Sequence, residues 1–250
     1  MVMIVFFTIN LLFGFLGTNV FQIIFEFLQT PLLNLGDTLG AMVVAYIFLH
    51  LFWFFGVNGG SVVGAVFNPI LQTLSAGNIA GEHHIICQQF QDLFATFGGA
   101  GSTLSLVIAM LLFCKSKRIT NLGKLSFVPG IFGINEPILF GAPIVLNPMF
   151  FIPFVICGGI IGSLGGWAMY LGIMKCSTFT PPYVGVFLEG FLTNMDPMSI
   201  VVNAVQLILS ILIWYPFVKS YEKTYGNKEE ETNAISAEDA AILDDLDLDF

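Results

Sequence analysis

Charged side chains are scarce in this sequence. They make up 10% of its 250 residues, whereas about 25% is usual in a soluble domain. Hydrophobic residues make up 56%, and the mean hydropathy is +0.86. This composition disfavours a soluble globular fold and predicts an all-α integral membrane protein.

A basic surface is also lacking. The net charge is −9, and nine of the 17 acids fall in the last 22 residues, 229–250. The rest of the chain holds eight acids and eight bases and is neutral. Nucleic-acid binding requires a basic face, so that class of function is excluded. We expect residues 226–250 to form an acidic, disordered tail.

Motifs for catalysis and cofactor binding are missing. The sequence contains no CxxC pair, P-loop, HExxH motif or Ser-His-Asp pattern. His83 and His84 are adjacent and cannot share one helix face, which argues against a metal site there. We expect no metal, no cofactor and no catalytic residue. The four cysteines are interpreted as small buried apolar residues, namely Cys87, Cys114, Cys157 and Cys176.

Long apolar runs are what the sequence has in quantity. A membrane-spanning helix needs about 20 mostly apolar residues, and the runs predict about five such helices. They cover residues 2–28, 39–57, 98–114, 149–174 and 198–218. Residues 29–38 are amphipathic and predict a connector at the membrane interface. Residues 78–97 are too polar to span, which predicts a position at the membrane surface or in a cavity.

Two further apolar segments contain glycines and prolines, which favour broken helices. These segments are 56–77 and 129–148, and the second has four prolines and three glycines. Irregular backbone at membrane depth persists only where protein buries it or where it lines a wet cavity. Two such segments in one chain indicate a transporter's binding site, so we expect two re-entrant hairpins there.

Basic residues predict the orientation. One cluster lies at 115–124 and a second at 219–228, with two predicted crossings between them. Positive residues favour the cytoplasmic side. Both clusters, and with them the C-terminus, are therefore expected in the cytoplasm.

Glu136 is the leading candidate for substrate binding, because a carboxylate at membrane depth is costly and indicates function. Its oxygens accept strong hydrogen bonds from sugar hydroxyls, although a capping role at a broken helix is the alternative. Its neighbour Asn135, Asn58 with Gly59, and Trp53 are further candidates, and Asn58 has a turn role as its alternative. His50, inside an apolar run, is either a packing residue or part of a proton relay.

The sequence also resembles a known family. The similarity is carried by LQTPLLNLGDTLGAMVVAYIFLHLFWFFGVNGG at 28–60, by the core GINEPILFG within 115–155, and by TPPYVGVFLEG at 180–190. On these motifs the chain resembles the membrane-spanning IIC component of the bacterial phosphoenolpyruvate-dependent sugar phosphotransferase system, specifically its lactose/cellobiose group. The match covers the C-terminal half of such a protein.

The resemblance implies a multi-pass permease of the bacterial plasma membrane. It implies that residues 1–38 are the last span of an interface region with its connector, and that 39–225 form the substrate domain. It also implies that Glu136 binds a sugar such as cellobiose, diacetylchitobiose or lactose. The implied partners are the lipid bilayer, a cytoplasmic phosphorylated IIB component, and a second copy in a homodimer once the N-terminal half is supplied. The phosphorylation is not this chain's own chemistry.

Two positions depart from the family pattern. Asn58 stands where members usually have a histidine that contacts sugar, and Thr178 where they often have a tryptophan. Two other functions stay open. One is a truncated or degenerate IIC fragment without transport of its own. The other is a proton-coupled secondary transporter using Glu136 and His50.

Overall fold

The computed structural model describes residues 38–182 and 184–226, and this part of the chain is built of helices, as predicted. The predictions made for residues 1–37 and for the tail beyond residue 226 fall outside the described residues. The helices are α3 (Leu39–Phe54), α4 (Gly59–Ile79), α5 (Gln88–Phe90), η1 (Gln91–Ala95), η2 (Ala100–Ser102), α6 (Thr103–Phe113), α7 (Lys117–Ile131), α8 (Glu136–Gly141), α9 (Pro148–Val155), η3 (Ile156–Ile160), η4 (Ile161–Ser163), α10 (Leu164–Tyr170), α11 (Val186–Asn194) and α12 (Met198–Tyr225).

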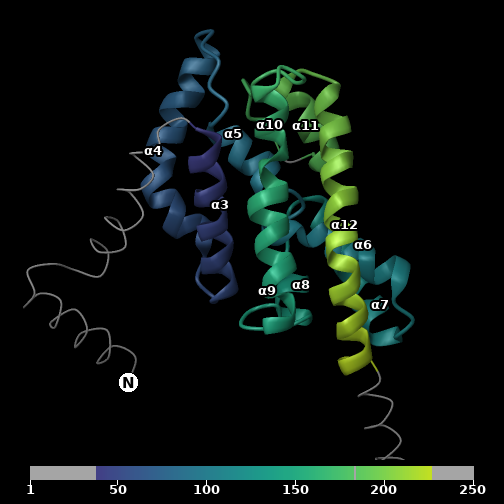
Figure 1. Cartoon of the computed structure of the whole chain (residues 1–250). Helices are drawn as coiled ribbons and strands as arrows, with labels where there is room; N and C mark the ends of the chain where they lie inside the picture. The colour runs from purple at the N-terminus through teal and green to yellow at the C-terminus, as the bar shows by residue number, and fades with distance from the viewer. Residues whose placement is uncertain (1–37, 183, 227–250) are drawn as a thin grey trace, which may run out of the picture.

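Helices α3 and α4 form the outer pair on the left of Figure 1. The turn between them is tight, because a Cβ on Gly59 would lie 1.9 Å from the carbonyl oxygen of Leu49. The expectation of a broken segment at 56–77 is wrong, since α4 runs unbroken for 21 residues. Pro69 lies inside this helix without ending it. Prolines occur inside membrane helices where neighbouring groups satisfy the freed backbone carbonyl.

The next long helical unit contains a bend. Residues Gln88–Phe113 form one apolar helical unit of 26 residues, which includes part of the stretch expected to be too polar to span. It bends at residues 98–102, where Gly98, Gly99 and Gly101 have positive φ values of 62°, 95° and 71°. A residue with a Cβ adopts such angles rarely, so these glycines permit the break.

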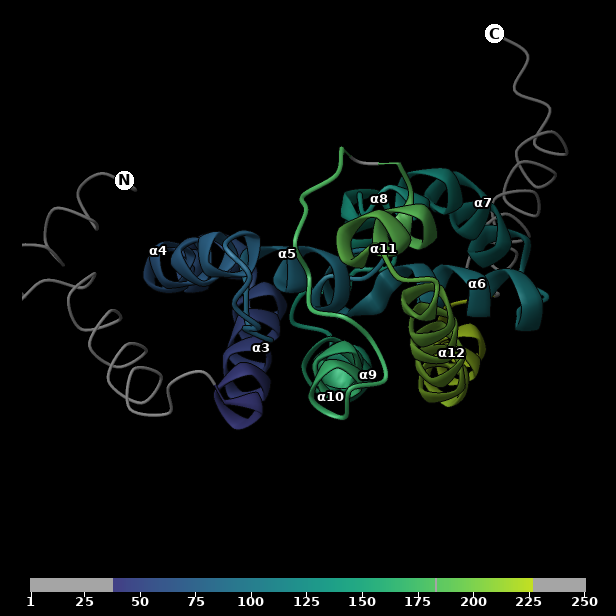
Figure 2. The same ribbon diagram turned by 90° about the horizontal axis from the view of Figure 1, so that it is seen from above.

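The second proline-rich segment is broken, as predicted. Helix α7 ends at Ile131, a turn covers 132–135, and the short α8 folds back along α7, where a Cβ on Gly141 would meet the side chain of Leu122. Figure 2 shows α7 and α8 next to each other beside α6 and α11. This pair enters and leaves from one end of the described bundle, which is the geometry expected of a re-entrant hairpin.

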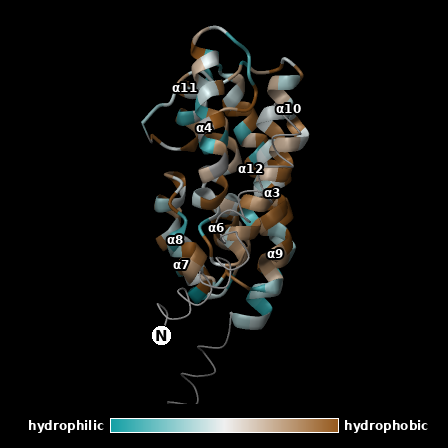
Figure 3. Cartoon of the chain, turned by 90° about the vertical axis from the view of Figure 1, so that its left-hand side faces the viewer, coloured by the Kyte–Doolittle hydropathy of each residue, from teal (hydrophilic) through white to brown (hydrophobic). Residues whose placement is uncertain are grey.

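Three helical units in the described part are long and apolar enough to cross a membrane: Gln88–Phe113, Pro148–Tyr170 and Met198–Tyr225. A shorter apolar helix, Leu39–Phe54, covers most of the run expected at 39–57. Hydrophobic residues predominate along α3 and α9 (Figure 3). Only 22% of the most apolar window of α12 is buried, against 72% for residues 88–113. Helix α12 therefore presents an apolar face outward, and the bent helix forms the interior.

The two basic clusters meet at one end of the molecule. The Lys219 ammonium donates a hydrogen bond to the carbonyl of Phe113 at 3.1 Å and pairs with Glu222. The Glu222 carboxylate in turn accepts a bond from the Ser116 amide at 2.9 Å. The loop 114–117 and the end of α12 therefore lie on the same side, as the two crossings between them require.

Candidate functional site

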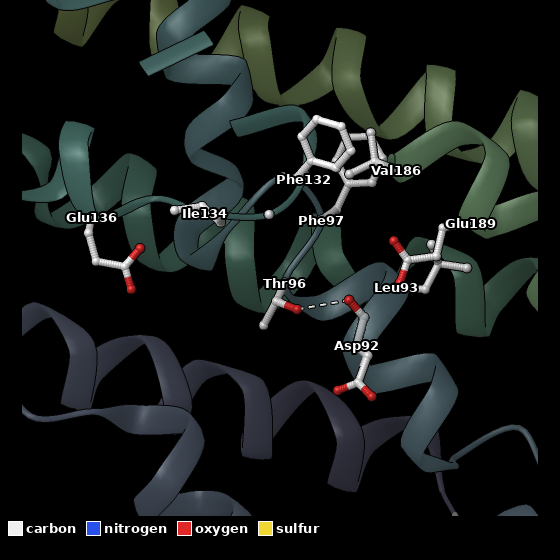
Figure 4. A pocket seen from close by; sticks show the side chains of 11 residues that line it. Asp92, Leu93, Thr96, Phe97, Phe132, Ile134, Glu136, Val186 and Glu189 are labelled. Carbon is white, nitrogen blue, oxygen red and sulfur yellow. Dashed lines mark hydrogen bonds between the residues drawn. The ribbon is translucent and has the colours of Figure 1, made fainter. Parts of the chain in front are cut away.

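A cavity of about 550 Å³ lies where the bent helix, the α7–α8 turn and α11 come together. Its walls include three acids, Asp92, Glu136 and Glu189, each from a different element (Figure 4). The remaining wall consists of Leu93, Thr96, Phe97, Gly98, Phe132, Gly133, Ile134 and Val186. A volume of this size is within the range of about 300–1,000 Å³ that small-molecule sites occupy.

Glu136 stands at the first position of α8, where the chain turns back after α7. The turn is made by Gly133, whose φ is 74°, and the amide of Ile134 closes it by donating to the carbonyl of Pro129 at 3.0 Å. The carboxylate of Glu136 is exposed and receives no hydrogen bond from any residue that the structure describes. Its acceptor oxygens are therefore free to bind a ligand that enters the cavity.

Asn135 fixes the α7–α8 turn against the bent helix. A Cβ on Gly99 would lie 2.6 Å from the Cβ of Asn135, so the two backbones approach as closely as they do because Gly99 has no side chain. Asn135 is 5% exposed, and its amide nitrogen has no hydrogen-bond partner among the described residues. A buried amide donor without a partner is costly, but this nitrogen is itself buried, and Asn135 is not among the residues that line the cavity.

Asp92 and Glu189 lie across the cavity from Glu136 in Figure 4. Asp92 comes from η1, and its carboxylate accepts a hydrogen bond from the side-chain amide of Gln88 at 3.0 Å. Thr96 donates to the backbone carbonyl of Asp92 at 2.9 Å, the dashed line in Figure 4. Glu189 comes from α11, is 9% exposed, and is close enough to Asp92 for the two charges to repel.

The sequence analysis did not single out these two acids. Asp92 lies in a stretch interpreted only as too polar to span, and Glu189 lies inside a quoted family motif. Each is an isolated acid in an apolar segment, which is the same signal that identified Glu136. That signal could have identified them.

Asn135 does not line the cavity, and neither do the three other sequence candidates besides Glu136. Asn58 is exposed and caps α4, because its side-chain oxygen accepts a hydrogen bond from the Ser61 amide at 2.9 Å. Gly59 makes the close approach to α3 described above, and Trp53 is partly buried against the core formed by α6, α9 and α12. The structure gives these residues structural roles, and their contact with substrate stays a prediction.

His50 is enclosed between α3 and η3. Its Nδ1 lies 2.6 Å from the carbonyl of Tyr46, and its ring meets Phe154 edge-on with centroids 5.7 Å apart. The ring does not line the cavity that holds Glu136. His50 therefore has the surroundings of a packing residue.

Comparison with known proteins decides the family. The model of the family "Phosphotransferase system, EIIC" matches residues 1–158. The chain belongs to this family. It is 34% identical over 226 residues to the oligo-beta-mannoside-specific EIIC component of Bacillus subtilis, an alignment that covers 87% of this chain and 51% of that protein. It is 34% identical over 238 residues to the lactose-specific EIICB component of Streptococcus mutans, covering 88% of this chain and 40% of that protein.

A solved structure shows the same arrangement. It is the crystal structure of the transporter ChbC, the IIC component of the N,N'-diacetylchitobiose-specific phosphotransferase system. The TM-score is 0.74 at 34% identity, and the match covers 85% of this chain and 51% of that one. The chain thus has the EIIC fold and spans about half the length of the curated EIIC relatives it matches. EIIC components are membrane permeases for sugars, and other components of the system carry out the phosphorylation.

Proposed function

We propose that this chain is the sugar-translocating subunit of a phosphotransferase system, with Glu136 as the main polar anchor for the sugar. The observation that carries the proposal is the carboxylate of Glu136, which projects into a cavity of about 550 Å³ at the turn between two short helices. Its acceptor oxygens have no partner in the described structure, and sugar hydroxyls are donors that match them.

Asn135 precedes Glu136 in the same turn. Its buried amide nitrogen has no partner among the described residues and lies outside the cavity lining, so its contact with a sugar hydroxyl stays a prediction. The names of relatives, which specify oligo-beta-mannosides, lactose and N,N'-diacetylchitobiose, support a β-linked disaccharide as the proposed substrate.

The membrane arrangement follows from the same proposal. Residues 39–225 form the substrate domain, and the chain crosses the membrane about five times, counting the apolar run at 2–28. The end where the two basic clusters meet faces the cytoplasm, where a phosphorylated IIB partner transfers its phosphoryl group to the sugar. The homodimer is formed through the interface region. A rigid-body shift of the substrate domain carries the cavity from one side of the membrane to the other.

Two alternatives remain. The chain spans about half the length of the curated relatives it matches, and a IIC fragment without transport of its own is the first alternative. The proton-coupled transporter is less well supported, because His50 does not line the cavity with Glu136.

Binding and uptake measurements test the proposal. Purified full-length chain in detergent should bind a β-linked disaccharide in calorimetry, and uptake into cells should require phosphoenolpyruvate. Uptake abolished by a collapsed proton gradient but independent of phosphoenolpyruvate would favour the secondary transporter. Sugar binding without any uptake would favour the fragment.

A further inference from the structure

The wall of the cavity opposite Glu136 holds an unpaired buried acid. Glu189 is 9% exposed, and its carboxylate receives no hydrogen bond from any residue in the described ranges. It lines the cavity together with Asp92 (Figure 4), and two negative charges in one cavity disfavour each other. Burying a carboxylate without a partner is costly, and a second carboxylate nearby raises the cost.

No cation of this part of the chain offsets that charge. The described lining of the cavity contains three acids and no Lys, Arg or His. Lys175 is the basic residue next to the end of α11, and its contacts there are made by its backbone. Its backbone N–H donates a hydrogen bond to the Asp196 carboxylate at 3.1 Å, and its backbone carbonyl accepts one from the Asn194 side chain. Lys175 lines a different cavity. The acids at the Glu189 wall therefore need a proton or a bound cation to neutralise them.

A protonated amine fits this wall better than a metal ion. The described residues contain no group of three or more His, Cys, Asp or Glu placed to hold a metal. An ammonium group has three donors and needs acceptors around it. Glu189 offers two free oxygens, while Asp92 keeps one oxygen beyond the bond from Gln88. Two carboxylates on one side of an ammonium also give strong, charge-assisted hydrogen bonds.

We propose that Glu189 and Asp92 form a subsite for a protonated amine, so that the cavity takes an amino sugar whose amine is free rather than acetylated. The inference rests on the proposed sugar-binding function and names its substrate class. Glu136 holds hydroxyls on one side of the cavity, and the ammonium is held on the other (Figure 4).

Three disaccharides with one ring skeleton test the subsite. Chitobiose carries an amine at C2 of each ring, N,N'-diacetylchitobiose an acetamide, and cellobiose a hydroxyl. Calorimetry on the full-length chain near neutral pH should show chitobiose binding at least about 10-fold tighter than either analogue, since a charged hydrogen bond contributes about 1.5–3 kcal/mol.

Glu189→Gln should remove most of that preference. Chitobiose affinity should fall about 10- to 100-fold while cellobiose affinity changes little. Glu82→Gln is the matched control, because it removes an exposed acid outside this cavity and should leave all three affinities unchanged. Thermal unfolding of each variant checks that it folds.

The parent protein alone can overturn the inference, whether or not the variants fold. If it binds cellobiose as tightly as chitobiose, a proton neutralises the acids and the amine subsite is wrong, while the proposed sugar site stands. An unchanged preference in a folded Glu189→Gln protein would also overturn it. Binding of none of the three sugars would overturn both proposals.

Discussion

The substitution Glu136→Gln isolates the charge of the proposed sugar anchor. It keeps the shape of the side chain and one acceptor oxygen but removes the negative charge. Because the carboxylate accepts no hydrogen bond within the described residues, its replacement breaks no internal hydrogen bond there. The only structural cost we expect is the loss of a favourable charge at the start of a short helix, about 0.3–1 kcal/mol. That corresponds to a fall in melting temperature of roughly 1–4 °C.

The effect on binding should be larger. Charge-assisted hydrogen bonds contribute about 1.5–3 kcal/mol, so sugar affinity should fall about 10- to 100-fold. The assay is calorimetry with the tightest-bound of cellobiose, N,N'-diacetylchitobiose and chitobiose, on parent and variant in the same detergent. Glu82→Gln again serves as the control for a lost acid outside the cavity. A Glu136→Gln protein that melts like the parent and binds sugar as tightly would show that Glu136 is not the anchor.

Three further outcomes are expected. Gly158→Ala would place a Cβ 2.0 Å from the ring of His50, so overpacking should cost about 1–3 kcal/mol in a thermal melt. Adding His50→Ala should restore part of the loss, and an unchanged melt in the single variant would contradict this packing. Asn58→Ala should lower stability by about 1 kcal/mol through the lost cap and leave sugar affinity nearly unchanged, whereas weaker binding at equal stability would make Asn58 a substrate contact. Reporter fusions at Lys117 and Lys228 should both give a cytoplasmic signal, and a periplasmic signal at either would refute the orientation.

Agreement between sequence and structure is best for the long apolar helices. Runs at 149–174 and 198–218 correspond to the helical units Pro148–Tyr170 and Met198–Tyr225, because hydropathy and helix length are local properties of the chain. The proline-rich segment 129–148 is broken as expected, since four prolines cannot continue one regular helix. Segment 56–77 shows the limit of the same rule. Its single proline and its glycines lie within a continuous helix.

The candidate site was predicted only in part. Glu136 was singled out because a carboxylate beside a helix break indicates function, and it lines the cavity, whereas its neighbour Asn135 does not. Spacing along the chain could not test whether the same site also includes Asn58, Gly59 and Trp53. The structure places them at the α3–α4 turn and in the core rather than on the cavity wall.

The sequence by itself determined the class of the molecule, the positions of its long helices and the acid at the helix break, because each depends on composition or on neighbours in the chain. Only the tertiary structure decided which acids share a cavity. Asp92, Glu136 and Glu189 come from three elements far apart in sequence. They converge because glycines at 98–101 break one helix and allow the turn before α8 to pack against it. That convergence depends on backbone packing between segments, which the order of residues along the chain does not show.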